Sequence, residues 1–358
     1  MESYAKEAFI SEKQTLREIF DSFFHDDMKN IVAGNVDGKI HGLQNEFVGK
    51  HRFCPIFIQS EIGQRIYRRS IIFLMIIAVH RLFSDAEVIV RFTVNKGLYC
   101  DIVFKNHKLT ADDVSLIDKE MKKIVSENIP ITKQRLPREI AIQLFKESKQ
   151  IAKVNLLNSL ILKEVSVFFC GKDYGYFYGS MLDNTGELGQ FKINYEEPGI
   201  LLRTPAGGKA ICSEVKQPKF RSILTESKEW AEILHCGYIP DLNRYIKHNK
   251  ITDIIRVSEA LHEKRIANIA DEIASNINRV RLITIAGPSS SGKTSFSQRL
   301  KVQLRVLGLE PVSLSLDDYF WERERNPKLP NGEYDYESLD ALDLELVNDH
   351  LLKLLNGE

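Results

Sequence analysis

The spacing of apolar positions changes several times along the chain and divides it into segments with different predicted structures. We predict four segments: residues 1–65, 66–222, 223–278 and 279–358. In the first segment, a charged helical pattern at 12–24 precedes short alternating stretches such as 31–40. This combination predicts a small α+β module.

The second segment contains both helical and strand-like patterns. An apolar helix is predicted at 67–83, and strand-like runs follow at 87–92 and 98–104. Thr110 is the predicted N-cap of another helix, because two aspartates follow it in the first turn. Glycines and aromatic residues crowd together at 173–208, which indicates tight strands and turns. We therefore expect a second α+β domain.

The third segment is helical. Its last part repeats apolar residues at intervals of three and four, namely Ile266, Ile269, Ala270, Ile273, Ala274 and Ile277. These residues fall on one face of a helix. We predict that the segment connects the α+β part to the remainder of the chain.

The fourth segment begins with an abrupt change to a strand-like pattern. A strand is predicted at 282–286, a helix at 294–307 and a second strand at 312–316. Gly308 is expected to end the helix. Strand, helix and strand together predict a parallel, right-handed βαβ unit, so the expected fold is multidomain α+β followed by α/β.

A phosphate-binding motif joins the predicted strand and helix of this unit. The residues assigned to nucleotide binding are Gly287, Ser289, Ser290, Ser291, Gly292, Lys293, Thr294 and Ser295. They follow the pattern G-x-x-x-x-G-K-[ST], in which backbone N–H groups and the helix N-terminus surround a polyphosphate. Lys293 is expected to reach the β- and γ-phosphates of ATP or GTP, and the Thr294 hydroxyl to ligate Mg²⁺.

Asp317 follows the second predicted strand, at the sheet edge where ligands bind in open α/β folds. It is a candidate general base for an acceptor hydroxyl, or a Mg²⁺ ligand through water. The alternative is an ordinary turn residue, because consecutive aspartates commonly open loops.

The overall charge argues against broad nucleic-acid binding. Lysine plus arginine equals aspartate plus glutamate, at 49 each, so the chain lacks a general electropositive field. Any RNA contact must therefore be local. Arg65, Arg68 and Arg69 form one candidate, although such clusters are more often solvated helix starts. The aromatic run at 174–178 is another, although packing within a sheet is the favoured interpretation.

The remaining composition suggests a cytoplasmic protein without a membrane anchor or a metal centre. The N-terminus carries no signal-peptide pattern, and the most apolar run, at 71–79, is far shorter than the roughly 20 residues that span a bilayer. Neither CxxC nor HxxxH spacing occurs among the cysteines and histidines. The cysteines are Cys54, Cys100, Cys170, Cys212 and Cys236.

The fourth segment resembles the phosphoribulokinase and uridine kinase family. The resemblance rests on residues 287–294, 315–320 and 336–343. It implies ATP-dependent phosphorylation of a nucleoside hydroxyl, with Lys293 and Asp317 as catalytic residues. It also implies that an acidic residue at the Glu337 position, or Asp335 in the other register, holds the ribose.

The upstream segments resemble parts of threonyl-tRNA synthetase. Residues 31–65 are similar to a degraded TGS domain, and 67–205 to the second N-terminal domain of that synthetase, on the motifs at 97–101 and 189–192. The synthetase domain edits mischarged tRNA with histidine and cysteine side chains. The matching positions here are Arg69, Phe73, Phe177 and Met181. The resemblance therefore implies a domain without editing chemistry or a metal.

Together, the two resemblances predict a bacterial nucleoside kinase with synthetase-like N-terminal modules. Residues 280–358 supply only two confident strands, so we expect the kinase domain to be truncated and weakly active. The alternative is a nucleotide-binding regulatory or RNA-associated protein without kinase activity. The acceptor nucleoside, the choice of ATP or GTP and the oligomeric state stay open.

Overall fold

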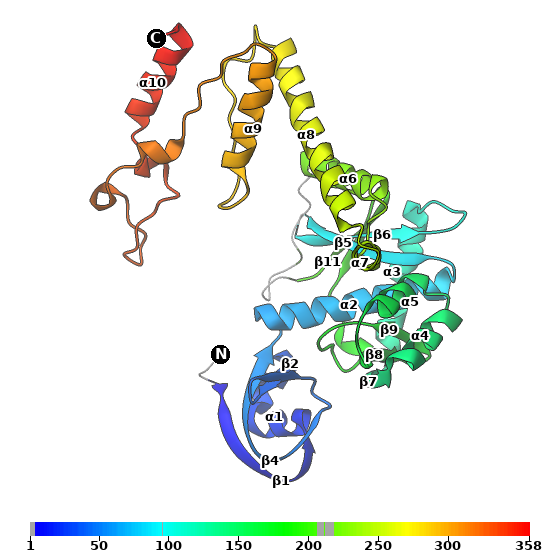
Figure 1. The fold of residues 1–358 in the computed structure, drawn as a ribbon. Helices are drawn as coiled ribbons and strands as arrows, with labels where there is room; N and C mark the ends of the chain where they lie inside the picture. The colour runs from blue at the N-terminus through cyan, green and yellow to red at the C-terminus, as the bar shows by residue number, and fades with distance from the viewer. Residues whose placement is uncertain (1–3, 95, 206–210, 212–217) are drawn as a thin grey trace. The chain divides into compact units, whose positions relative to one another are not determined.

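The computed structural model describes residues 4–94, 96–205, 211 and 218–358. Its first module is a four-stranded antiparallel sheet with strand order β1-β4-β2-β3 and one packed helix (Figure 1). The elements are β1 (Lys6–Thr15), α1 (Leu16–Phe24), β2 (Ile31–Val36), β3 (Lys39–His41) and β4 (Glu46–Phe57). Fully buried Leu16, Ile19 and Phe20 of α1 pack against Phe53 of β4.

The predicted helix at 12–24 is half right. A capping box starts α1 after Thr15, whose hydroxyl accepts from the Glu18 amide, while the Glu18 carboxylate accepts from the Thr15 amide. Residues before this cap pair with β4 instead, because Ile10 needs that sheet to bury its side chain. Tertiary pairing therefore overrides the helical pattern of residues 12–15.

The second module contains two antiparallel sheets. One has strand order β10-β11-β6-β5 and the other β7-β8-β9. Their strands are β5 (Glu87–Val94), β6 (Gly97–Val103), β7 (Ile131–Pro137), β8 (Glu164–Cys170), β9 (Asp173–Tyr176), β10 (Lys192–Glu196) and β11 (Gly199–Arg203). The predicted strands at 87–92 and 98–104 are confirmed as β5 and β6. The end of the predicted strand-and-turn region, 206–208, lies outside the described residues.

The long apolar helix α2 (Glu61–Leu82) connects these two sheets through one core (Figure 1). Its fully buried residues Ile71, Phe73 and Leu74 share this core with Cys100 of β6 and Phe168 of β8. The predicted helix at 67–83 is confirmed, with a start six residues earlier. Ser60 causes that earlier start, because its hydroxyl accepts from the Gly63 amide as an N-cap.

Shorter helices complete the second module. They are α3 (Ala111–Glu127), α4 (Arg138–Glu147) and α5 (Ile151–Ser159). Thr110 begins α3 through a capping box with Asp113, as predicted. Helices α4 and α5 cover the outer face of the β7-β8-β9 sheet, where Phe145 and Val167 are fully buried. The opposite face of this sheet lies toward α2.

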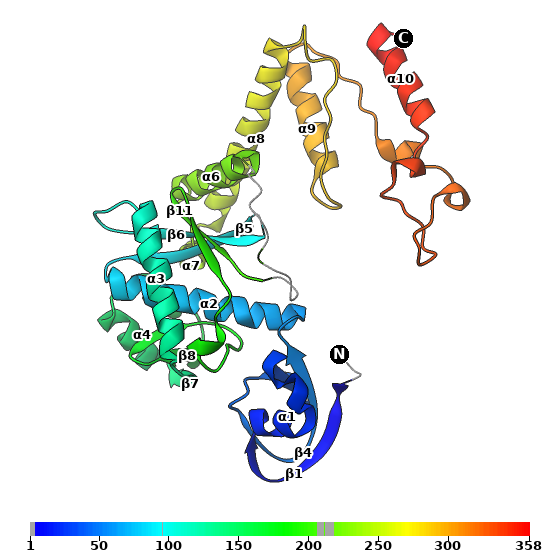
Figure 2. The same ribbon diagram turned by 180° about the vertical axis from the view of Figure 1, so that it is seen from behind.

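The helical segment is broken into three helices rather than one continuous stretch. They are α6 (Pro218–Ile233), α7 (Ile239–Lys247) and α8 (Ile251–Ser275). The predicted apolar face at 266–277 is confirmed in part: Ile266 and Ala270 of α8 pack against Leu300 and Leu304 of α9 (Lys293–Val306). Helices α8 and α9 lie side by side in both views (Figure 2).

The predicted parallel βαβ unit is not formed. Residues 280–286 and 310–315 form no strand in the described chain, and the last helix is α10 (Leu344–Asn356). Apolar side chains of both segments are exposed, including Leu282 at 54% and Val312 at 66%. The predicted strands at 282–286 and 312–316 are therefore wrong, because a strand needs a hydrogen-bonded partner and the described residues supply none.

Two compact units divide the chain. The first comprises Met1–Glu229 and Tyr238–Arg244, and the second Trp230–Gly237 and Tyr245–Glu358. This division is coarser than the four segments expected from the sequence, and those four boundaries stay a prediction.

Candidate functional site

The first unit gathers the four positions that the sequence comparison with the synthetase domain singled out, Arg69, Phe73, Phe177 and Met181. Arg69 and Phe73 lie four residues apart on α2, so their side chains lie on the same face of that helix. The segment after β9 faces them: the rings of Phe177 and Phe73 lie 5.5 Å apart, and Met181 is buried in the same core. The structure therefore brings the four sequence-predicted positions to one place. We call it the α2–β9 site: Arg69, Phe73, Lys133, Phe177, Tyr178 and Met181.

A buried hydroxyl fixes the segment after β9 on α2. Ser70 is fully buried; its hydroxyl donates to the Ile66 carbonyl at 3.0 Å and accepts from the Leu182 amide at 2.9 Å. Because Ser70 follows Arg69 directly, the part of α2 that fixes this segment also carries Arg69 and Phe73 of the α2–β9 site.

Two cations converge on the loop that follows β9. The Arg69 guanidinium donates to the carbonyl of Ser180, and the Lys133 ammonium donates to the carbonyl of Gly179 at 3.1 Å. Burial lowers the pKa of Arg69, and burial followed by the nearby charges of Arg135 and Arg69 lowers the pKa of Lys133. Among the described residues, no carboxylate forms an ion pair with these two side chains. The site is therefore positively charged and unneutralised.

The chemistry of the site differs from hydrolysis. Phe73, Phe177 and Met181 supply neither a nucleophile nor a metal ligand, and arginine is a poor general base because it stays protonated. No group of three histidine, cysteine, aspartate or glutamate side chains within the searched, described part of the chain has metal-binding geometry. The arrangement can hold an anion.

The aromatic run at 174–178 mostly packs, as its simpler interpretation predicted. The Tyr174 hydroxyl donates to the Leu144 carbonyl at 2.9 Å, and Tyr176 is buried. Tyr178 differs because it is 63% exposed, with its ring 5.2 Å from that of Tyr176. The Tyr178 ring is thus open to solvent, one residue before Gly179, whose carbonyl accepts from Lys133.

The arginine cluster expected at the start of α2 does not act as one group. Arg65 pairs with Glu61 at 2.5 Å, one turn away, and Arg68 is exposed. Only Arg69 turns toward the α2–β9 site. Lys133 of β7 was not identified from the sequence, because a lone lysine on a strand has no local signal and its carbonyl partner lies 46 residues away.

A second charged cluster surrounds Arg81 at the end of α2. Its guanidinium contacts Asp173 at 3.2 Å, Glu127 at 3.1 Å and Glu120 at 3.4 Å. Three carboxylates around one arginine neutralise it fully. The cluster ties α2 to α3 and β9, which is a structural role.

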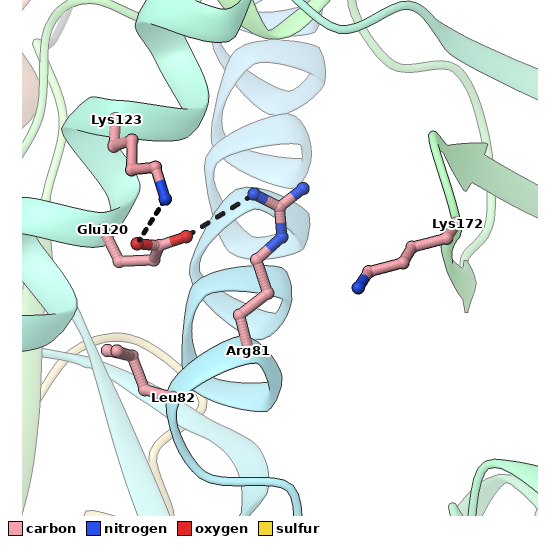
Figure 3. Close-up of a pocket in the computed structure, with 5 residues that line it drawn as sticks. All are labelled: Arg81, Leu82, Glu120, Lys123 and Lys172. Carbon is pink, nitrogen blue, oxygen red and sulfur yellow. Dashed lines mark hydrogen bonds and ion pairs between the residues drawn. The ribbon is translucent and has the colours of Figure 1, made fainter.

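An open pocket of about 470 Å³ adjoins this cluster (Figure 3). Arg81, Leu82, Glu120, Lys123 and Lys172 line it. Lys123 pairs with Glu120 at 3.7 Å, and Lys172 extends toward Arg81 from the turn between β8 and β9. Because the carboxylates already engage Arg81 and Lys123, the pocket is a weak candidate for an anion.

The second unit contains the predicted phosphate-binding loop. Gly292 has a left-handed conformation with φ of 86° and precedes the first turn of α9, as the motif requires. The Lys293 ammonium folds back and donates to the carbonyls of Gly287 at 2.7 Å and Pro288 at 3.1 Å. The loop therefore curls around its own lysine at a helix N-terminus.

The loop borders an open cleft of about 530 Å³ between the loop, α8 and α9. Ser291, Gly292, Lys293 and Ser295 line it, together with His262 and Arg299. The Arg299 guanidinium contacts His262 Nδ1 at 3.1 Å. Four of the predicted nucleotide-binding residues are thus grouped in one cleft.

The other predicted residues lie elsewhere in this unit. Asp317 is exposed in a short 3₁₀ turn, η4 (Leu316–Tyr319), where its amide donates to Ser315 Oγ. Asp335 accepts from the Glu337 amide in a turn of the following loop. None of Asp317, Asp335 and Glu337 lines the cleft. The turn interpretation of Asp317 matches its geometry.

Comparisons with known proteins find similarity to threonine–tRNA ligases over slightly less than half of the chain. No protein-family model matches the chain. It is 30% identical over 169 residues to the threonine–tRNA ligase of Aquifex aeolicus (strain VF5), covering 46% of this chain and 26% of that ligase. The ligase of Clostridioides difficile (strain 630) is 29% identical over 146 residues, or 41% of this chain and 23% of the ligase.

A third relative agrees with these two. The ligase of Geobacillus kaustophilus (strain HTA426) is 30% identical over 166 residues, covering 46% of this chain and 25% of the ligase. The chain thus spans about a quarter of the length of the curated relatives it matches. The similarity supports the expected synthetase-like modules.

The same findings correct the predicted function. The relatives are tRNA ligases, so the predicted nucleoside kinase of the uridine kinase type, with Asp317 as general base, is wrong. A nucleoside as the acceptor has no support. The kinase prediction rested on the segments 287–294, 315–320 and 336–343, and the structure does not bring the acidic residues of the last two to the cleft beside the first. In the part of the chain that was searched, no helix is long and apolar enough to cross a membrane.

Proposed function

We propose that the first unit is a tRNA-binding module related to threonine–tRNA ligases that holds RNA without hydrolysing it. The α2–β9 site carries the proposal, because Arg69 and Lys133 converge there without a carboxylate to neutralise them. A phosphate group is the natural counter-charge for such a pair.

Exposed Tyr178 fits the same ligand. Aromatic rings stack on unpaired bases, and cations beside them contact the backbone, so the pair of features suits a single-stranded RNA end. The neutral overall charge keeps this recognition local, since the rest of the surface attracts nucleic acid little.

Fluorescence anisotropy with a labelled tRNA tests the proposal. We expect Arg69→Gln and Lys133→Gln each to weaken binding by roughly tenfold and to lower the slope of log Kd against log salt by about 1, the value for one lost phosphate contact. Lys122→Gln is the matched control, because Lys122 pairs with Asp118 on α3 outside the site. It should leave the Kd unchanged.

Two results would reject the proposal. Absence of tRNA binding by the parent chain would remove the function, and equal weakening by Lys122→Gln would mean that binding is diffuse. A mischarged tRNA adds a chemical readout. We expect its ester bond to break no faster with the chain than in buffer, because Phe73, Phe177 and Met181 cannot activate water.

We also propose that the loop of the second unit binds a Mg²⁺-nucleotide such as ATP without transferring phosphate to a nucleoside. The observation that favours it is the pairing of left-handed Gly292 with Lys293, whose ammonium is held at the mouth of the loop. A polyphosphate would replace those two carbonyl contacts with charged oxygens. Thr294 would then be the residue to contact Mg²⁺.

Isothermal titration calorimetry with Mg-ATP and Mg-GTP tests this second proposal. Lys293→Gln should raise the Kd at least about tenfold, since one charge-assisted contact contributes about that much. Lys301→Gln, on the same helix α9, is the control and should bind as the parent does. No heat with either nucleotide in the parent would refute the proposal.

A further inference from the structure

Arg203 ends β11 with a side chain that is only 2% exposed. Ile200 and Leu202 of the same strand belong to the main core. Because side chains alternate along a strand, Arg203 and Leu201 share the opposite face of the sheet. The side-chain stem of Arg203 crosses Gly97 of β6, where an added Cβ atom would come within 2.9 Å of Arg203 Cγ. The missing side chain at Gly97 makes the room that Arg203 occupies.

Most of the Arg203 guanidinium lacks hydrogen bonds. Nη1 donates to the side-chain oxygen of Asn194 at 3.0 Å, whereas Nε and Nη2 are buried and have no hydrogen-bond partner among the described residues. Buried polar groups are nearly always satisfied, and a buried charge without a partner is costly. Two such nitrogens on one side chain therefore need an explanation.

The two orphaned nitrogens are not scattered. Nε and Nη2 lie on the same edge of the planar guanidinium, and their N–H groups point in parallel, which is the edge that binds a carboxylate or phosphate through two hydrogen bonds. The contact with Asn194 holds the opposite part of the group. The two-pronged edge is therefore left buried and unpaired.

The surrounding charge is positive. Lys192 of β10 lies directly across the strand pair from Arg203 and is exposed. Like charges at opposed positions destabilise a sheet, and neither side chain forms an ion pair within the described part of the chain. The nearest buried carboxylate on this sheet, Asp101, is already paired with Arg91 at 2.7 Å and Lys228 at 3.2 Å.

We propose that Arg203, with Lys192, forms a binding site for an oxyanion that presents two oxygens to the Nε–Nη2 edge, the chemistry shared by a phosphate group and a carboxylate. Such an anion satisfies both buried nitrogens and neutralises the opposed charges at once. The proposal is independent of tRNA binding at the α2–β9 site, because it rests on a different sheet and different residues.

The full chain labelled with ¹⁵N allows a direct test, because each arginine Nε–H gives its own NMR signal. Inorganic phosphate, acetate and chloride are titrated at equal ionic strength. We expect phosphate or acetate to shift one Nε–H signal saturably and chloride to leave it unmoved. A shift with phosphate alone identifies a phosphoryl ligand, and a shift with both identifies a carboxylate-compatible site.

Variants then assign the signal and separate charge from geometry. Arg203→Lys keeps the positive charge but removes the two-pronged edge, so it should lose the shifted signal and any rise in the unfolding temperature caused by the anion. Lys192→Gln keeps the edge and should weaken the anion roughly tenfold. If no Nε–H signal of the parent responds to phosphate or acetate beyond chloride, the site does not exist; this readout needs no variant to fold.

Discussion

Removing the Ser70 hydroxyl should destabilise the first unit more than its small size suggests. The hydroxyl is the only acceptor that the described structure provides for the Leu182 amide, and Leu182 is 2% exposed. In Ser70→Ala the Ile66 carbonyl keeps its helical hydrogen bond, whereas the Leu182 N–H is left buried and unsatisfied. The loss falls on the segment that carries the α2–β9 site.

The magnitude follows from two opposing contributions. An unsatisfied buried amide costs about 1–3 kcal/mol, and alanine is a better helix former than serine by up to about 0.5 kcal/mol. We therefore expect the free energy of unfolding to fall by ~0.5–2.5 kcal/mol. The most protected amides, which exchange through unfolding, should then exchange roughly 2- to 70-fold faster.

Hydrogen exchange is the suitable assay, because both tryptophans, Trp230 and Trp321, belong to the second unit and cannot report on the first. The slowest-exchanging amides of β6 and β8 are compared between variant and parent. Ser115→Ala is the matched control: Ser115 also donates to the carbonyl four residues earlier, at 3.1 Å, but is exposed on α3.

The comparison between the two serine variants shows whether the hydrogen bond from the Leu182 amide to Ser70 stabilises the first unit. Ser115→Ala should leave stability unchanged or raise it slightly, because only helix propensity changes. Equal effects of the two substitutions would show that the Leu182 amide finds another acceptor, and the bridge from Ser70 would then carry no stabilisation.

Two further predictions concern the first unit. Gly63→Ala should lower the free energy of unfolding by at least about 2 kcal/mol, because a Cβ atom there would lie 2.0 Å from the Phe57 carbonyl oxygen. Gly42→Ala is the control and should cost little, because the nearest atom to its added Cβ lies at 3.6 Å. Equal melting temperatures of the two variants would contradict this prediction. The hydrogen bond to Asp37 raises the pKa of His51 above 6.5. The stabilisation that this hydrogen bond gives the folded chain is therefore present below pH 6.5 and is lost as the pH rises through the raised pKa. NMR titration of the imidazole measures the pKa of His51, and a value at or below 6.5 would refute the prediction.

Local signals in the sequence predicted several elements correctly. Thr110 caps α3 with residues three positions away, and the apolar run at 67–83 has no better arrangement than a buried helix. Such interactions close within one turn or one stretch of chain, so the residues that make them are visible together. The start of α2 at Ser60 was missed because the sequence also allowed a later start.

Long-range contacts could not be read in the same way. Lys133 meets Gly179 across 46 residues and Ser70 meets Leu182 across 112. The phosphate-binding motif was visible, but the strands predicted beside it depend on partners that the motif does not contain. That dependence is why the motif survives in the structure as a loop and helix while the predicted sheet does not.

By itself, the amino-acid order determined the buried helix α2, the cap of α3 and the glycine-rich loop before α9, because each depends on neighbours within a few residues. Only the tertiary structure decided that Arg69 and Lys133 converge on one loop, and that Arg203 is buried with one edge unpaired. The physical reason is that burial and charge compensation are properties of packed surroundings, and those surroundings come from segments far apart in the chain.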